Sequence, residues 1–307
     1  MGQEEADSAL VAFVKTRDRV QGVRNALALL DDVEFGHNDV LLKPNFNSAD
    51  PTPGSTHTDV LRTLIEELRE RGAGSITVAD RSGMGVTRRV MEEKGVFAMA
   101  PRMGFEALVF DELPADRWVM AQPPGSHWQR GFAIARPVLE ADAVVQTCCL
   151  KTHRFGGHFT LSLKNSVGMV AKQVPGDDYD YMQELHSSPF QRLMISEINA
   201  AYNPSLVVLD GVEAFVSGGP DSGQRVWAEV VLAATDRVAV DAVAVAVLRY
   251  SGTTPEVMRG PIFEQEQIAR AVELGLGVDG PDRIRLVTAD PESEAYAGEI
   301  QEVLGRG

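Results

Sequence analysis

Cysteine is nearly absent from this sequence: Cys148 and Cys149 are the only two among 307 residues. They are adjacent in an apolar run that predicts a strand, where successive side chains point to opposite faces of a sheet. A cubane iron–sulfur cluster or a zinc-ribbon site needs four ligands, most often cysteines. The cysteines of this chain therefore cannot ligate an iron–sulfur cluster alone.

Basic residues are also scarce, because 29 Lys and Arg stand against 44 Asp and Glu and give a formal net charge of −15. Such a surface repels nucleic acid and anionic membranes. No apolar run is long enough to span a bilayer, and residues 1–9 lack the basic region and apolar core of a secretory signal. We expect a cytoplasmic protein that binds no nucleic acid and no membrane, either as a single chain or as a homo-oligomer.

Two hydrolase motifs are missing as well. The sequence contains neither the Gly-x4-Gly-Lys-Ser/Thr loop of nucleotide hydrolases nor the Gly-x-Ser-x-Gly turn of Ser-His-Asp hydrolases. The sequence therefore does not predict either of these two kinds of hydrolase.

The sequence does contain short apolar runs that alternate with helical patterns. This alternation predicts an α/β fold with a mostly parallel sheet and helices on both faces, in which residues 1–307 form a single unit; two lobes around a cleft are the alternative. The expected strands are 11–15, 40–42, 76–79, 108–110, 144–150, 206–209, 228–234 and 284–288, and the expected helices are 19–30, 59–71, 87–94, 187–201, 238–250 and 263–274. Residues 114–129 hold prolines and two tryptophans and are expected to be irregular.

Four of these apolar runs end on chemically capable residues. Lys43-Pro44-Asn45, Asp80 to Gly83, Lys151-Thr152-His153 and Asp210-Gly211 each follow such a run. Ligands of open α/β sheets bind beyond the carboxyl ends of the strands, so these clusters are expected to line one cleft.

The segment 151–168 is the richest in such residues, with two lysines, two histidines, an arginine and a glycine pair. The glycines are expected to lead into a helix whose first N–H groups bind a carboxylate or phosphate. The predicted ligand is thus a small anionic metabolite. The residues expected to bind it are Lys43, Asn45, Asn47, Ser82, Lys151, Thr160, Asn165 and Gly219.

Three residues are candidates for catalysis. His153 and His158 could transfer protons, and Lys164 could abstract a proton or form a Schiff base if burial lowers its pKa. The alternatives are a helix-capping or exposed histidine and an ordinary anion-binding lysine.

A divalent metal is a further open possibility, with His57, Asp80 and Asp210 as its ligands, or with His153 and His158 together with His57 or Asp80. The alternatives are a helix cap in the segment Thr56 to Asp59, with Thr56 or Thr58 as the cap, and a plain turn after Asp80. Asp236 is expected to cap a helix, and Asp241 is a weaker site candidate.

Several of these segments together resemble the domain-of-unknown-function 362 family. They are Leu42 to Asn45, Ala79 to Gly83, Lys151 to His153, Thr160 to Asn165 with Gly168, and Asp210-Gly211. The resemblance extends over residues 40–288 and implies an α/β fold. Some relatives carry ferredoxin-type cysteine motifs and are described as iron–sulfur proteins, whereas this chain lacks those cysteines.

A more distant similarity links His153, Lys164 and Gly168 to the nickel-pincer lactate racemase family. There, such a lysine tethers a nickel-bearing cofactor and histidines assist hydride and proton transfer. The similarity implies an isomerase or lyase that acts on a small anionic substrate.

The sequence thus favours an enzyme of isomerase or lyase type that uses lysine and histidine acid–base chemistry. Two alternatives stay open at this point. One is a protein that binds or matures a metal or metallocofactor, and the other is a redox accessory protein that works with a separate ferredoxin.

Overall fold

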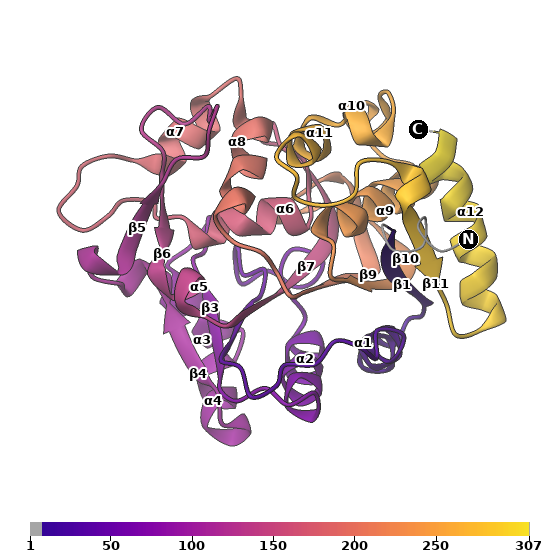
Figure 1. Ribbon diagram of the computed structural model, residues 1–307, viewed down its shortest axis with the longest axis horizontal. Helices are drawn as coiled ribbons and strands as arrows, with labels where there is room; N and C mark the ends of the chain where they lie inside the picture. Colours follow the sequence, from indigo (N-terminus) through magenta and orange to yellow (C-terminus); the bar gives the residue numbers. More distant parts are fainter. Residues whose placement is uncertain (1–7, 307) are drawn as a thin grey trace.

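The computed structural model describes residues 8–306 and contains a large sheet with the strand order β11-β1-β10-β9-β7-β2-β3-β4, to which β8 is added beside β7 (Figure 1). All strands of this sheet run in one direction except β8 and β10. The predicted α/β fold with a mostly parallel sheet is confirmed. The strands are β1 (Ala9–Lys15), β2 (Val40–Lys43), β3 (Ile76–Asp80), β4 (Glu106–Val109), β7 (Ala143–His153), β8 (His158–Thr160), β9 (Leu206–Gly218), β10 (Gly223–Ala234) and β11 (Ile284–Val287).

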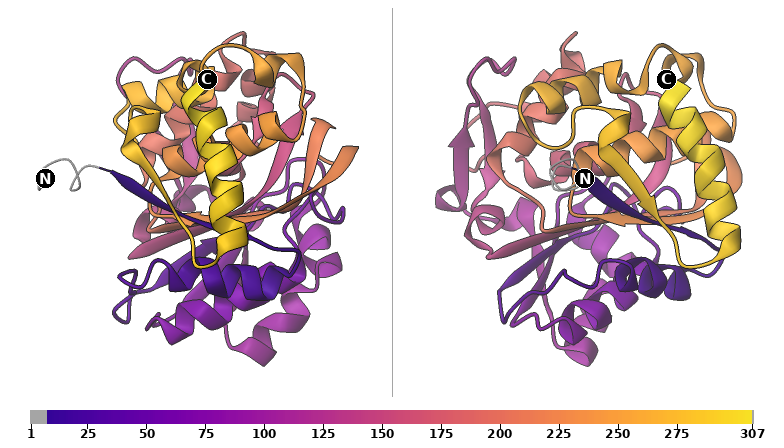
Figure 2. Two further views of the ribbon diagram at one scale, coloured as in Figure 1. Left: turned by 90° about the vertical axis from the view of Figure 1, so that its right-hand side faces the viewer. Right: turned by 45° about the vertical axis from the view of Figure 1, so that its right-hand side comes forward.

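Helices cover both faces of the sheet, as expected (Figures 1 and 2). The first face is covered by α1 (Arg19–Ala28), α2 (Thr58–Glu70), α3 (Thr87–Glu93) and α4 (Val96–Met103). The helices of the other face are α5 (Arg136–Glu140), α6 (Ser162–Asn165), α7 (Tyr181–Ser187), α8 (Gln191–Ile198), α9 (Arg237–Tyr250), α10 (Pro255–Met258), α11 (Glu266–Glu273) and α12 (Pro291–Arg306). No helix among residues 8–306 is long and apolar enough to cross a membrane. The expectation about a secretory signal concerns residues that lie almost wholly outside this described part.

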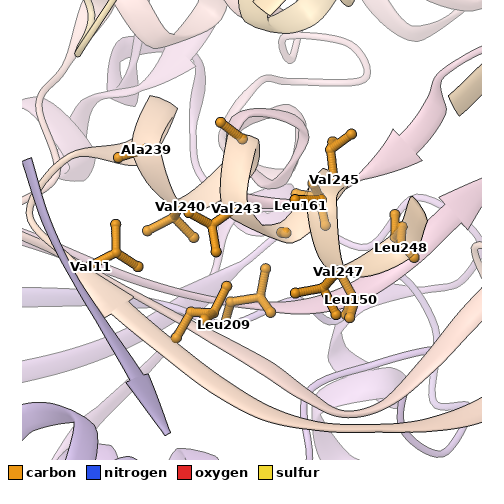
Figure 3. Packing of buried hydrophobic residues seen from close by; sticks show 14 of the residues in the cluster. Val11, Leu150, Leu161, Leu209, Ala239, Val240, Val243, Val245, Val247 and Leu248 are labelled. Atoms are coloured by element: carbon orange, nitrogen blue, oxygen red, sulfur yellow. The ribbon is translucent and has the colours of Figure 1, made fainter. Parts of the chain in front are cut away.

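The two faces separate because side chains alternate along each strand. Val11 and Phe13 of β1 belong to the cluster under α9, whereas Ala12 and Val14 belong to the cluster over α1 and α2. Figure 3 shows α9 laid on the sheet, with Val240, Val243 and Val247 above residues such as Leu209. α9 also contacts α6, α11 and α12, which explains why alanine and valine surround it on every side.

The sequence prediction differs from the structure in several segments: it lacks α4, α5, α7, α10 and α12, and the helix expected over 187–201 is the shorter α8. Residues 118–121, expected to be irregular, form β5 (Trp118–Ala121), which pairs with β6 (Phe132–Ala135) in a separate two-stranded sheet. The glycine pair Gly156-Gly157 leads first into β8, and the helix expected after it, α6, has only 4 residues. The predicted strand 206–209 continues as β9 to Gly218.

Candidate active site

The site lies where the connections of the sheet change direction. The chain runs outward from β2 to β3 and β4 and then returns to place β7 on the other side of β2. Such a switch point leaves a crevice beyond the carboxyl ends of the two strands that flank it. Lys43 ends β2, Asp80 ends β3 and His153 ends β7, so the strand ends bring these three residues to one place.

A cavity of about 220 Å³ opens at this point. Most of the residues that the sequence predicts for the site line it. The predicted residues in its wall are Lys43, Asn45, Asn47, Asp80, His153, Thr160, Lys164 and Asn165. The polar residues that follow the predicted strands therefore indicated the position of the cavity correctly.

Lys43 and Asp80 form an ion pair at the base of the cavity, with 2.7 Å between Nζ and Oδ1 and both side chains 1% exposed. Lys43 also donates to the carbonyl of Pro44 and to Oδ1 of Asn165, and Asp80 accepts the backbone N–H of Phe46 at 2.8 Å. Burial lowers the pKa of Lys43, and Asp80 partly offsets this effect. The hydrogen-bonding capacity of the pair is thus used mainly within the protein.

Lys164 lies in the same cavity in a different environment. Its side chain is 9% exposed, and within the described residues its Nζ has neither a hydrogen bond nor an ion pair. Burial, followed by the positive charges of Lys151 and Arg81, lowers its pKa to about 7. A large part of this amine is therefore uncharged at neutral pH, which makes it a base or a nucleophile.

His153 is a fixed hydrogen-bond donor. Its Nδ1 accepts the backbone N–H of Gly157 at 3.2 Å, so the proton of the neutral ring is on Nε2. Burial and then the charges of Lys164 and Lys151 lower its pKa far below its ordinary value. The ring stays neutral near pH 7, and we interpret His153 as a donor through Nε2–H.

Gly157 allows His153 and Lys164 to lie close to each other. A Cβ atom at position 157 would be 2.8 Å from Nδ1 of His153 and 3.1 Å from Cε of Lys164. Any other residue would displace one of the two side chains.

Three side chains that line this cavity carry a hydrogen-bond donor that has no partner among residues 8–306. Oγ1 of Thr160 and Nδ2 of Asn47 are buried with no partner, and Nζ of the partly exposed Lys164 also has none. The carboxylates that line the cavity are engaged, because Asp80 binds Lys43 and Asp180 caps α7 through the N–H groups of residues 182 and 183. The site thus contains a set of three free donors, contributed by Asn47, Thr160 and Lys164.

Comparison with known proteins identifies the family of this chain. Residues 40–246 match the model of "Domain of unknown function (DUF362)". The chain belongs to the DUF362 family. All residues that line the cavity fall inside the matched range, although the match ends within α9 and not at residue 288 as expected.

One curated relative of this DUF362 chain is the "Thylakoid-associated protein sll1697" of Synechocystis sp., which is 24% identical over 222 residues. That alignment covers 71% of this chain and 65% of the relative, so the chain spans about two thirds of the relative's length. Among solved structures, the lactate racemase apoprotein from Thermoanaerobacterium thermosaccharolyticum is similar with a TM-score of 0.49 and 15% identity, covering 98% of this chain and 87% of that one. The expected distant similarity is thus found, and at this level it carries no information about chemistry.

Lys151 does not line the cavity of the DUF362 site, contrary to its predicted role as an anion ligand. It is 0% exposed, and its Nζ donates to Oδ1 of Asn45 at 2.8 Å and to the carbonyls of Gly54 and Pro220 at 2.5 and 3.2 Å. We interpret it as a tether that holds two loops beside the cavity. Its charge still acts on Lys164.

Three further predicted residues do not line the cavity. His158 lines a separate hollow of about 360 Å³ with Thr254 and Glu256, since β8 carries it away from Lys164. Oγ of Ser82 is buried and donates to the carbonyl of Phe46. Gly219 packs its backbone against Thr152 and contributes no side chain.

The predicted metal ligands are not assembled. His57 caps α2 by accepting the N–H of Asp59, and Asp210 pairs with Arg19 at 2.8 Å. Asp80 is bound to Lys43. Across residues 8–306, no group of three or more His, Cys, Asp or Glu side chains could hold a metal ion. Cys148 and Cys149 are both free and buried.

The amino end of α6 was predicted to bind the anion, and this prediction is wrong. Asp241 of α9 already accepts the N–H groups of Ser162 and Leu163 at 2.8 and 3.0 Å, together with the hydroxyl of Ser162 at 2.6 Å. Burial raises the pKa of Asp241 to about 6. The weaker candidate Asp241 is thus a structural cap.

Sequence reasoning missed several residues of the wall. Arg81 donates to the carbonyls of Val167 and Val170 and so holds the segment that closes the cavity. Lys172 and His186 also line it. Arg81 could have been predicted from its place next to Asp80. Lys172 and His186 could not, because nothing in the sequence shows that α7 folds over this edge of the sheet.

Proposed function

We propose that this protein is an enzyme that binds a small anionic metabolite and transfers a proton at a carbon atom next to a carbonyl group, as isomerases and lyases do. The observation that supports it most is the donor set of the cavity. Asn47, Thr160 and Lys164 each present a polar atom that has no acceptor within the protein. A carboxylate or phosphate would supply the missing acceptors.

The charges of the cavity also favour an anion. The cations Lys43, Arg81 and Lys172 line it, against two carboxylates, in a protein whose net charge is −15. A local excess of positive charge inside an acidic molecule concentrates small anions where the chemistry takes place. The volume of about 220 Å³ is below the range of roughly 300–1,000 Å³ that is typical for drug-sized ligands, so the metabolite is small.

Two residues would carry the chemistry. The uncharged amine of Lys164 supplies a lone pair at neutral pH, and Nε2–H of His153 donates to the substrate oxygen on which negative charge develops. The hydroxyl of Thr160 and the amide of Asn47 would hold the anionic group.

Thr160→Val tests anion binding at this cavity. The change removes the unpartnered hydroxyl with little change in shape, so the affinity for inorganic phosphate or oxalate should fall roughly tenfold, the equivalent of about 1.4 kcal/mol. Isothermal titration calorimetry at neutral pH measures this loss.

Thr147→Val is the matched control. Oγ1 of Thr147 is also buried without a partner, but this residue does not line the cavity. The control should bind as the wild type does. Equal affinities of Thr160→Val and the wild type, or no binding of either anion to the wild type, would contradict the proposal.

A further inference from the structure

The lysines at this site differ in what their amines contact. Lys43 is bound to Asp80, Lys151 to three oxygens, and Lys172 lies 3.6 Å from Asp111 and 3.4 Å from the carbonyl of Gly85. Lys164 has no oxygen partner anywhere in the described chain, although it is only 9% exposed. Lys164 is thus the one lysine among these four whose amine is free to react with a ligand.

The surroundings of Lys164 suit an amine that attacks a carbonyl carbon. Nε2–H of His153 can donate to the oxygen of that carbonyl, and Thr160 and Asn47 can hold a carboxylate next to it. A small 2-oxo acid carries these two groups on adjacent carbon atoms.

A second residue of the cavity can act as the base, so Lys164 is not needed for that role. Nδ1 of His186 lies 2.7 Å from the carbonyl oxygen of Met182, and a carbonyl only accepts, so the ring proton is on Nδ1. The lone pair of Nε2 is therefore available, and His186 lines the same cavity at its solvent-exposed end.

We infer that Lys164 is a covalent nucleophile that forms an imine with a small 2-oxo acid, and that His186 is the base for the adjacent carbon. This inference rests on the proposed function and specifies its substrate class. Nζ attacks the carbonyl carbon, and the carbonyl oxygen leaves as water with the two hydrogens that the amine loses. A proton from solvent turns the imine into an iminium ion. Nε2 of His186 then takes a proton from the neighbouring carbon, and the electron pair of that C–H bond moves toward the iminium nitrogen to give an enamine.

Borohydride trapping tests the covalent step. The full-length protein is incubated with pyruvate and sodium borohydride, whose hydride reduces the imine to a stable secondary amine. Intact-mass and peptide mass spectrometry should then find one adduct per chain, located on Lys164. Lys164→Arg has a similar length but no nucleophilic amine and should give no adduct, whereas Thr147→Val should react as the wild type does. Acetone, which has the carbonyl but not the carboxylate, should give far less adduct.

Deuterium exchange at the methyl group of pyruvate tests the base. His186→Asn keeps a donor for the Met182 carbonyl but removes the basic nitrogen, so the adduct should still form while exchange in D2O slows at least tenfold. An unchanged exchange rate would overturn the assignment of His186.

The results of these experiments distinguish failure of the imine from failure of the proposed anion binding. If phosphate and oxalate bind but no adduct forms on Lys164, or if the adduct lies on another lysine, the imine is overturned and anion binding stands. If neither anion binds and no adduct forms, both proposals are overturned.

Discussion

Lys43 and Lys164 show that two residues of the same type take different roles when their environments differ. Both are buried in one cavity, and burial lowers the pKa of both. Asp80 lies 2.7 Å from Lys43 and counteracts this effect, whereas the charged groups that shift the pKa of Lys164 are the cations Lys151 and Arg81. The first lysine is therefore suited to hold the site together, and the second to react.

The reactivity of Lys164 should follow a titration near pH 7. Acetic anhydride modifies only the uncharged amine, so the rate of labelling should rise as the pH increases through about 7, well below the ordinary lysine value of 10.5. Pulse labelling across the pH range followed by peptide mass spectrometry measures this rate. The charged and titratable groups that share the cavity or act on Lys164 are Lys43, Asp80, Arg81, Lys151, His153, Lys172, Asp180 and His186.

The unfolded protein provides the reference for this measurement. In concentrated urea the same peptide should be labelled with the profile of an ordinary lysine, because burial and the fixed charges are lost. If the native protein and the urea-unfolded protein gave the same profile, Lys164 would not be perturbed by the fold.

At the scale of elements, the turn α6 depends on a distant helix. Its 4 residues are too few to be a stable helix on their own, and Asp241 of α9 provides the acceptors for its first N–H groups. α6 carries Lys164 and Asn165 into the cavity, so the position of the reactive amine is set by α9.

Asp241→Asn should disturb this arrangement. The amide keeps only one acceptor oxygen and places its NH2 group toward a backbone donor, so about 1–3 kcal/mol of stability should be lost. Because α6 then shifts, labelling of Lys164 at neutral pH should change together with urea stability.

Asp236→Asn is the control, because Asp236 caps α9 and accepts no hydrogen bond from α6. This variant should lose stability but keep the labelling profile of Lys164. Equal effects of the two variants on that profile would contradict a specific link between Asp241 and the site.

Some of these elements, and the site residues at their ends, could be predicted from the sequence. The strands β2, β3 and β7 and the helix α2 were predictable because their apolar residues are periodic, and their ends located Lys43, Asp80 and His153. Asp210 was misplaced because the apolar run 206–209 is only the first part of β9, so Asp210 lies inside a strand and pairs with Arg19. The cap of α6 could not be predicted, since Ser162 and Asp241 are 79 residues apart and only the tertiary fold joins them.

At the scale of the whole molecule, an acidic surface surrounds a cavity with an excess of cations. The net charge of −15 repels anions at long range, and this repulsion increases with the charge of the ligand. The cavity attracts anions only at short range, because salt screens its field beyond about 10 Å at 0.1 M ionic strength. Small anions of low charge should therefore be admitted in preference to large and highly charged ones.

Protection of Lys164 from labelling measures this selection. Pyruvate, oxalate and inorganic phosphate should slow its modification by acetic anhydride at neutral pH, since each fits a cavity of about 220 Å³ and places an acceptor near the amine. ATP has a similar phosphate chemistry but is too large for the cavity and more strongly repelled by the surface, so at the same concentration it should protect much less. The difference should increase when the ionic strength is lowered, because the repulsion of the more highly charged ligand grows as screening decreases. Protection by ATP equal to that by phosphate would mean that the site is open to larger ligands, and the assignment of a small metabolite would then be wrong.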